Sequence, residues 1–250
     1  MELTFGFFVV AALATVFAGI SKGGFGSGAA FASATILALV IEPGKALGIM
    51  LPLLMLVDVA TLKPYWGRWH WQEAKVLLLG GIPGVGLGVL FYTLADDDLL
   101  RLLIGGIALL FVVWQLSQKF GLVTAPDRRL PRWVGILAGI VTGFTSFVSH
   151  AGGPPAAVYM LSQRLGKLEY QATSVLIFWI INIAKFAPYA FLGIFTFQTL
   201  LADLVLAPFA ILGAWIGVRA HFMLSEKVFF GITYVLLSVT GSKLIWDALV

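Results

Sequence analysis

The sequence contains no cysteine, three histidines and few charges, since only 11% of its residues are Asp, Glu, Lys or Arg. The absence of cysteine excludes disulfide bonds, thiolate metal sites and thiol redox chemistry. The few histidines, and the near absence of carboxylates from the apolar runs, disfavour a metal-ion transporter. We expect neither a metal nor a cofactor. The formal net charge of +4 is modest and lies in short loops, so it does not indicate a nucleic-acid-binding surface.

Apolar residues make up 60% of the chain, whereas soluble domains are close to half apolar and a quarter charged. Several apolar runs, including 76–94 and 99–116, are long enough to cross roughly 30 Å of hydrocarbon. We therefore expect an all-α integral membrane protein that crosses the inner or plasma membrane of a cell several times. The first apolar run lacks a basic leader, so we interpret it as a retained membrane segment and not as a signal peptide. No polar stretch is long enough for a soluble catalytic domain.

The order of the apolar segments repeats after about 125 residues. The expected segments lie at approximately 3–20, 28–41, 45–63, 73–95 and 98–117, and again at 132–148, 153–164, 168–191, 197–219 and 226–247. An ungapped shift pairs several residues of the two halves, for example Pro83 with Pro208. This agreement predicts an internal repeat, with a first transmembrane repeat at 1–117, a connecting loop at 118–131 and a second repeat at 132–250.

The basic residues divide the loops into two classes. Lys and Arg gather in four loops, at residues 63–75, 119–132, 164–167 and 219–227. The loops that alternate with them, at 95–98 and 193–198, are acidic or uncharged. Because Lys and Arg collect on the cytoplasmic side, this pattern predicts a cytoplasmic connecting loop and two repeats of inverted topology, with both termini outside. The short second segment of each repeat favours a broken or re-entrant helix at its start, which leaves the number of full crossings open.

Two polar, glycine-rich breaks interrupt apolar stretches at corresponding places in the two halves, at residues 21–28 and 146–155. Paired interruptions of this kind are the best sequence indication of a transporter binding site. Glycines allow unusual backbone angles, and the amides at a helix N-terminus attract anions. The residues of the breaks that we expect to bind substrate are Lys22, Gly24, Ser27, Ser149, His150, Gly152 and Gly153.

Both cationic residues of the breaks also have structural interpretations. A buried ammonium group costs roughly 2.5 to 3.5 kcal/mol on insertion scales, so Lys22 needs a partner or a wet cavity, unless it extends to the interface. His150 could bind the anion or take up a proton near neutral pH. It could equally be a neutral side chain bonded to a carbonyl group.

Lys185 lies deep within an apolar segment, far from both loop ends. Asn182 is three residues earlier and shares its helical face, so we expect both side chains in the binding site. Asp58 is a carboxylate inside the third apolar segment. It could pair with Lys185 or Lys22, or it could relay protons, as His150 could.

Other features are interpreted as structural. The glycines at 80–88 predict a small-residue face that lets two helices approach closely. Trp66, Trp69 and Trp71, together with Tyr65, are typical of an aromatic belt at the membrane interface.

The sequence resembles the sulfite exporter TauE/SafE family over nearly its whole length. The resemblance rests on the Ile-Ser-Lys-Gly-Gly-Phe-Gly run at 20–26, the Leu-Pro-Leu-Leu run that leads to Asp58, the His-Ala-Gly-Gly-Pro-Pro run at 150–155, Asn182 with Lys185, and Tyr189 near Gly193. It implies a membrane transporter with two related halves that moves sulfite, sulfoacetate or related organosulfonates. It also implies that Lys22, His150, Asn182, Lys185 and Tyr189 belong to family motifs.

These observations favour a secondary carrier for a small anion that works by alternating access, with proton coupling through His150 or Asp58. A passive anion channel is the main alternative. A third hypothesis is an intramembrane hydrolase, with Ser27 or Ser149 as nucleophile and His150 as base. The expected partners are a small anionic substrate and the lipid bilayer, and self-association into a homo-oligomer stays open.

Overall fold

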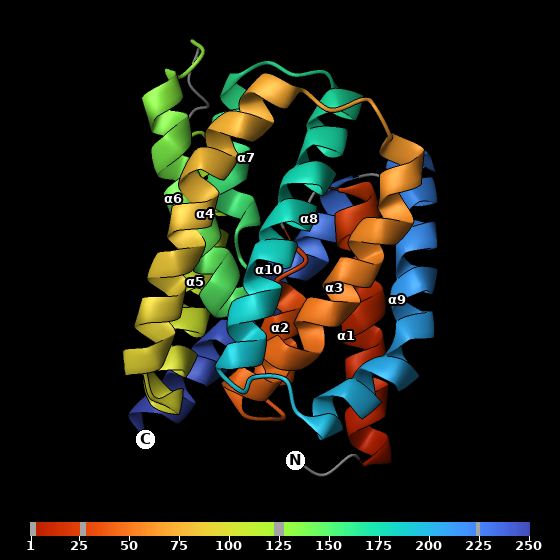
Figure 1. The fold of residues 1–250 in the computed structure, drawn as a ribbon, viewed down its shortest axis with the longest axis vertical. Helices are drawn as coiled ribbons and strands as arrows, with labels where there is room; N and C mark the ends of the chain where they lie inside the picture. The colour runs from red at the N-terminus through yellow and green to blue at the C-terminus, as the bar shows by residue number, and fades with distance from the viewer. Residues whose placement is uncertain (1–3, 26–28, 123–127, 224–225) are drawn as a thin grey trace.

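The computed structural model describes residues 4–25, 29–122, 128–223 and 226–250, which form ten α-helices and contain no strand (Figure 1). The helices are α1 (Phe5–Gly24), α2 (Ala32–Ala38), α3 (Pro43–Tyr65), α4 (Trp71–Leu94), α5 (Asp97–Lys119), α6 (Arg132–Ser149), α7 (Gly153–Ser162), α8 (Lys167–Phe191), α9 (Phe197–Met223) and α10 (Glu226–Leu249). All except α2 and α7 contain a stretch long and apolar enough to cross a membrane, which gives eight candidate spans in the described part of the chain. The prediction of an all-α, multi-pass membrane protein is confirmed.

The helix ends follow from local chemistry. The Thr4 side chain accepts a hydrogen bond from the Phe7 amide at the start of α1, and Asp96 caps α5 in the same way. Such caps satisfy amides that have no partner within the helix. Pro43 occupies the first position of α3, where its missing N–H costs nothing. The acidic loop at 95–98 thus includes the beginning of a helix.

Two of the expected boundaries are wrong. α1 continues into the first break and ends at Gly24, so Lys22 lies in its last turn and not in an unwound segment. α2 begins at Ala32, later than the expected start near Ser27. Ser27 itself lies outside the described residues.

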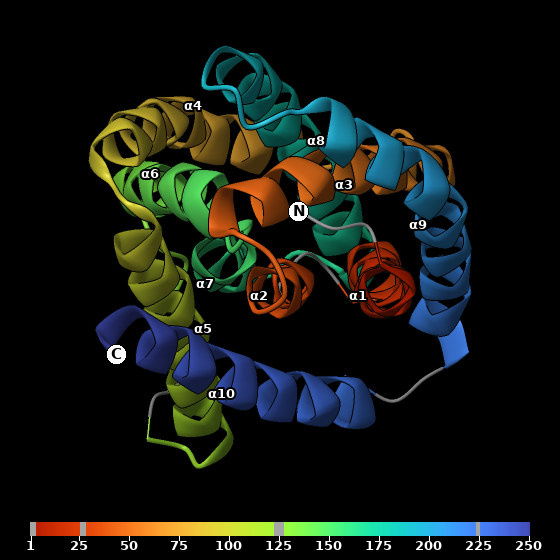
Figure 2. The same cartoon turned by 90° about the horizontal axis from the view of Figure 1, so that it is seen from below.

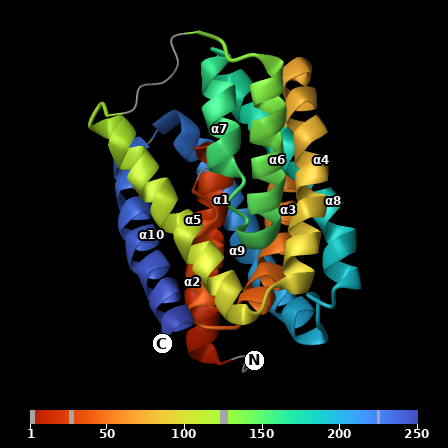
Figure 3. The same ribbon diagram turned by 90° about the vertical axis from the view of Figure 1, so that its left-hand side faces the viewer.

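The two short helices return toward the end from which the preceding helix came. α1 starts at the end of the molecule where both termini lie, and α2 turns back toward that end (Figure 3). α6 and α7 do the same from the opposite end. Seen along the helices, α2 and α7 lie in the middle of the molecule, between the long helices (Figure 2). Two helical hairpins therefore penetrate the bundle from opposite ends.

The first helix of each hairpin packs closely against a helix of the other half of the chain. α1 meets α9 where a Cβ atom added at Gly19 would lie 2.7 Å from the backbone of Gly213. α6 meets α4 where a Cβ atom at Gly143 would lie 1.9 Å from the carbonyl oxygen of Gly81. The expected small-residue face of α4 is thus found, and its partner is α6. Close backbone approach of this kind stabilises helix pairs in membranes, where burial of apolar surface contributes little.

Replacement of Gly84 by alanine tests this packing. The added Cβ atom would lie 2.2 Å from the carbonyl oxygen of Ile140, so α4 and α6 must move apart. We expect a loss of about 1–3 kcal/mol, the usual cost of overpacking, seen as a lower melting temperature in detergent. Gly86→Ala is the matched control on the same helix, because no atom lies within 4 Å of its added Cβ. Equal melting temperatures for the two variants would contradict the interpretation.

Candidate anion-binding site

Lys22 is buried in the centre of the molecule and paired with Asp58. Its side chain is only 3% exposed, and its Nζ lies 2.5 Å from Asp58 Oδ1 and 3.5 Å from the carbonyl oxygen of Leu54. The ammonium group therefore does not reach the interface. The lysine comes from α1 and the carboxylate from α3, so the ion pair joins the first hairpin to the helix that follows it.

The same carboxylate also joins the two halves of the chain. Asn182 on α8 donates a hydrogen bond from Nδ2 to Asp58 Oδ2, at 2.7 Å. Asp58 and Asn182 are 124 residues apart, and α3 and α8 hold the same place in the helix order of their halves. The third helix of the first five and the third helix of the last five are thus in direct contact.

Lys185, also on α8, is fully buried beside the tip of the second hairpin. Its Nζ donates to the carbonyl oxygen of Ser146 at 2.9 Å and lies 2.9 Å from His150 Nδ1. An ammonium group can only donate, so Nδ1 must be the acceptor. His150 Nε2 then carries the proton and donates to the carbonyl oxygen of Leu47, at 3.2 Å. This is the arrangement expected for a neutral histidine bonded to a carbonyl group.

His150 also forms the turn between α6 and α7. Its φ of 56° places it in the left-handed region, which costs a residue with a side chain roughly 1–2 kcal/mol. The turn directs the amides of His150 and Ala151 to the carbonyl oxygens of Ser146 and Thr145. The amide of Ala151 therefore ends α6 and is already bonded to a carbonyl group in this structure.

Two tyrosines secure the hairpins in equivalent ways. Tyr189 donates from its hydroxyl to the carbonyl oxygen of Phe147 at 2.5 Å, and Tyr65 donates to that of Gly23 at 2.7 Å. Both rings are buried. The assignment of Tyr65 to an interfacial belt is therefore wrong, because this side chain points inward while the neighbouring Trp66 is 66% exposed.

The other described residues of the two breaks that we expected to bind substrate contact neighbouring backbone atoms in this conformation. Ser149 donates from Oγ to the carbonyl oxygen of Thr145 in its own helix and is not among the residues that line the central cavity. A Cβ atom at Gly24 would lie 2.4 Å from the carbonyl oxygen of Gly217, and one at Gly152 would lie 2.8 Å from that of Thr142. Gly153 is the buried first residue of α7.

A central cavity of about 10 Å³ lies among these groups. The residues that line it are Lys22, Ala30, Leu54, Ser146, His150, Phe178 and Asn182. Such a volume holds about one water molecule. Both hairpins contribute to its wall, so the two breaks predicted from the sequence do meet, in a closed and polar centre.

The sequence profile that describes the sulfite exporter TauE/SafE family matches residues 11–244. The chain belongs to this family. Neither the curated proteins nor the solved structures provide a match to the chain. Members of the family are membrane transporters and not enzymes, so the interpretation as an intramembrane hydrolase is wrong. This agrees with the hydrogen bonds of the two residues, since Ser149 Oγ donates to Thr145 and His150 Nδ1 is bonded to Lys185.

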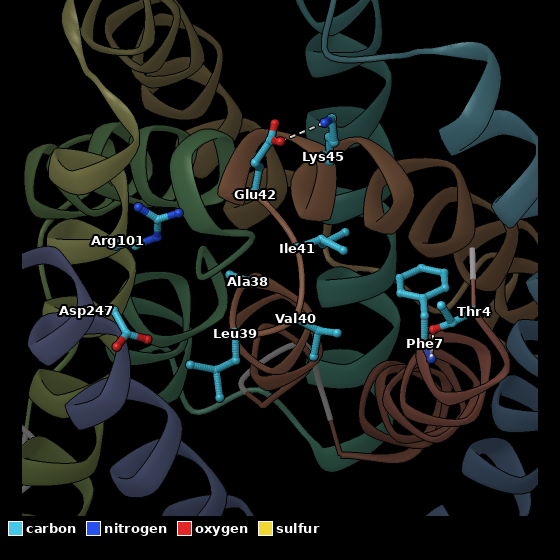
Figure 4. A pocket seen from close by; sticks show the side chains of 10 residues that line it. All are labelled: Thr4, Phe7, Ala38, Leu39, Val40, Ile41, Glu42, Lys45, Arg101 and Asp247. Carbon is cyan, nitrogen blue, oxygen red and sulfur yellow. Dashed lines mark hydrogen bonds and ion pairs between the residues drawn. The ribbon is translucent and has the colours of Figure 1, made fainter. Parts of the chain in front are cut away.

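A cavity of about 760 Å³ in this TauE/SafE protein lies at the end of the molecule where the termini lie (Figure 4). Its lining residues are Thr4, Phe7, Ala38, Leu39, Val40, Ile41, Glu42, Lys45, Arg101 and Asp247. The charged residues of this lining are already paired, Lys45 with Glu42 at 2.8 Å, Arg101 with Asp98 at 2.7 Å and Asp247 with Lys243. The hydrogen bond from Lys45 lowers the pKa of Glu42. The cavity therefore offers no unpaired cation to an anion.

A second cavity, of about 450 Å³, lies toward the basic loops. It is lined by Gly24 and Phe25 beside the first hairpin, by Pro154 of the second, and by Lys167 and Gln171 of α8. Gln171 is buried and donates from Nε2 to the carbonyl oxygen of Lys22, at 2.7 Å. This bond lies between the cavity and the central ion pair of the TauE/SafE protein.

Gln171 and Asp203 are two buried polar residues that the sequence analysis did not single out. Asp203 lies on α9, and neither of its carboxylate oxygens has a hydrogen-bond partner among the described residues. Asp203 interrupts an apolar segment, which is the signal that had identified Lys185, whereas Gln171 lies near the polar start of α8 and has no such signal.

Proposed function

We propose that the protein is a secondary carrier of small sulfur-containing anions, namely sulfite, sulfoacetate or related organosulfonates. The observation that supports this most strongly is the centre itself, where two buried ammonium groups, Lys22 and Lys185, are accompanied by a single carboxylate, that of Asp58. Buried charges inside membrane segments mark ion and substrate pathways. An oxyanion has several oxygens that can accept hydrogen bonds from the donors around the central cavity.

In the proposed binding mode the anion takes the place that Asp58 now holds. The oxygens of the anion accept hydrogen bonds from Lys22, Asn182 and Lys185, with His150 beside them. Ser149, Gly24, Gly152, Gly153 and Tyr189 shape the hairpins and contact the anion at most through their backbone. Asp58, once displaced from Lys22, is the group proposed to couple protons to transport.

The proposed mechanism is alternating access between two repeats, 1–117 and 132–250, of inverted topology. Three observations support it: the hairpins penetrate from opposite ends, equivalent residues of α3 and α8 touch, and one cavity lies toward each end of the molecule. In the cell membrane, the end with the basic loops, including 118–131, is proposed to be cytoplasmic, with both termini outside. Opening of one cavity toward the centre while the other stays closed then moves the anion.

The closed centre favours a carrier over a passive channel. A cavity of about 10 Å³ is far too small for sulfite, so the anion can reach Lys22 only after the hairpins move. A carrier exchanges substrate across the membrane in such steps, whereas an open pore conducts continuously.

Counterflow in proteoliposomes tests the proposed function. Vesicles preloaded with unlabelled sulfite or sulfoacetate are expected to accumulate the radiolabelled anion transiently above its outside concentration. Vesicles loaded with an equal concentration of a non-substrate anion, such as gluconate, are the control. Labelled anion that merely equilibrates, at a rate independent of the preloaded anion, would indicate a channel. Absence of any protein-dependent flux would contradict both the carrier and the channel.

A further inference from the structure

Four titratable side chains meet in the centre, and their contacts determine how many protons they hold. They come from four parts of the fold: Lys22 from α1, Asp58 from α3, His150 from the turn after α6, and Lys185 from α8. The net charge of these four side chains determines whether the closed site accepts a monoanion or a dianion.

Lys22 and Asp58 contribute no net charge. Their 2.5 Å contact shares one proton between an amine and a carboxyl group, and the pair is neutral whichever of the two holds it. Asp58 Oδ2 accepts a further hydrogen bond from Asn182. Each of these contacts favours the ionised carboxylate.

His150 and Lys185 contribute one positive charge between them. The 2.9 Å contact between Lys185 Nζ and His150 Nδ1 places one proton between two nitrogens, and a second proton there would put two donors face to face. Nε2 is already protonated and donates to Leu47. The pair therefore holds one proton fewer than an isolated lysine and an isolated histidinium would hold.

No other charged side chain reaches this centre within the described residues. α2 and α7 carry no charged residue at all, and the other charges of α3, α6 and α8 lie near the ends of those helices. Asp203, on α9, makes no hydrogen bond to any of the four groups. With the protons assigned from these contacts, namely two protonated lysines, one carboxylate and a neutral histidine, the empty centre carries a net charge of +1.

We infer that the site accepts one negative charge, so that a monoanion binds alone and a dianion binds together with one proton. A net charge that is enclosed away from water is costly unless it is balanced. A sulfonate with one charge makes the closed complex neutral. A sulfite dianion would leave one negative charge, which is cancelled when a proton from the solvent converts it to hydrogensulfite or protonates Asp58. The inference rests on the proposed function, because it presupposes that the anion binds among these four groups.

Calorimetry in buffers of different ionisation enthalpy measures the protons taken up on binding. The probes are methanesulfonate, a monoanion, and sulfite at an alkaline pH where it is a dianion. With the purified full-length protein in detergent, we expect a proton number near zero for methanesulfonate and near one for sulfite. The same proton number for both anions overturns the inference and leaves the proposed function standing. If neither anion binds, the proposed function fails as well.

An Asp58→Asn variant provides an independent readout. Removal of the carboxylate raises the net charge of the centre to +2, so sulfite is then expected to bind without a proton. The affinity for sulfite relative to methanesulfonate is expected to rise by at least about tenfold, since a buried positive charge attracts a second negative charge strongly. An unchanged proton number for sulfite overturns the inference. Should this variant not fold, the comparison of the two anions on the wild-type protein still decides the question.

Discussion

Lys185→Met is expected to abolish the thermal stabilisation that sulfite confers, while the helical fold is retained. A ligand at a hundred times its Kd stabilises the protein that binds it by about 2.7 kcal/mol, and this shift should disappear when the ammonium group is lost. Methionine has a similar length and fits an apolar slot. The variant should therefore lose only the hydrogen bonds to Ser146 and His150, worth about 1–3 kcal/mol together with the groups left unpaired.

The measurement is the melting temperature of the purified protein with and without sulfite, accompanied by far-ultraviolet circular dichroism. Lys63→Met is the matched control, because Lys63 is an exposed lysine near the end of α3 and its loss should leave the sulfite-dependent shift unchanged. If Lys185→Met is stabilised by sulfite as much as the parent protein, Lys185 does not bind the anion.

Lys22→Met is expected to destabilise the protein far more than the double replacement Lys22→Met with Asp58→Asn. The single change leaves the Asp58 carboxylate buried without its cation. Breaking a buried ion pair in this way costs about 3–5 kcal/mol of stability. The double replacement removes both charges, and the asparagine can still contact Asn182. Most of the lost stability should therefore return.

A double-mutant cycle on the free energy of unfolding measures this coupling. The exposed pair of Lys45 and Glu42 is the control, for which the coupling should be below about 1 kcal/mol because water screens both charges. Additive effects of the two central replacements would show that the ion pair of Lys22 and Asp58 contributes no coupling, contrary to the geometry.

Much of the architecture could be predicted because a bilayer imposes local rules. Apolar runs of sufficient length mark spanning helices, and the two short segments, 28–41 and 153–164, correspond to α2 and α7. The boundary at Lys22 was missed because a lysine next to glycines is typical of a helix end. Its partner Asp58 is 36 residues away in the sequence, and this contact keeps Lys22 within α1.

The site could be predicted as a set of residues and not as a set of contacts. Lys22, Asp58, His150, Asn182 and Lys185 were all identified as polar groups that a membrane segment does not hold without a reason. Ser149 was grouped with them, whereas Lys185 donates to Ser146, three residues earlier on the same helix, through its carbonyl oxygen. Every residue carries a backbone carbonyl group, so the sequence does not show which one serves as the acceptor.

By itself, the sequence determined that this protein is a bundle of membrane helices with two interruptions and a few charged residues within its apolar segments. Composition and hydrophobic length are sufficient for that, because each helix satisfies its own backbone hydrogen bonds in lipid. Only the tertiary structure decided that Asp58 pairs with Lys22 and not with Lys185, that His150 accepts from Lys185, and that the centre is closed. These contacts depend on which helices the close-packed glycines bring together and on the direction of each side chain, and neither is a local property of the chain.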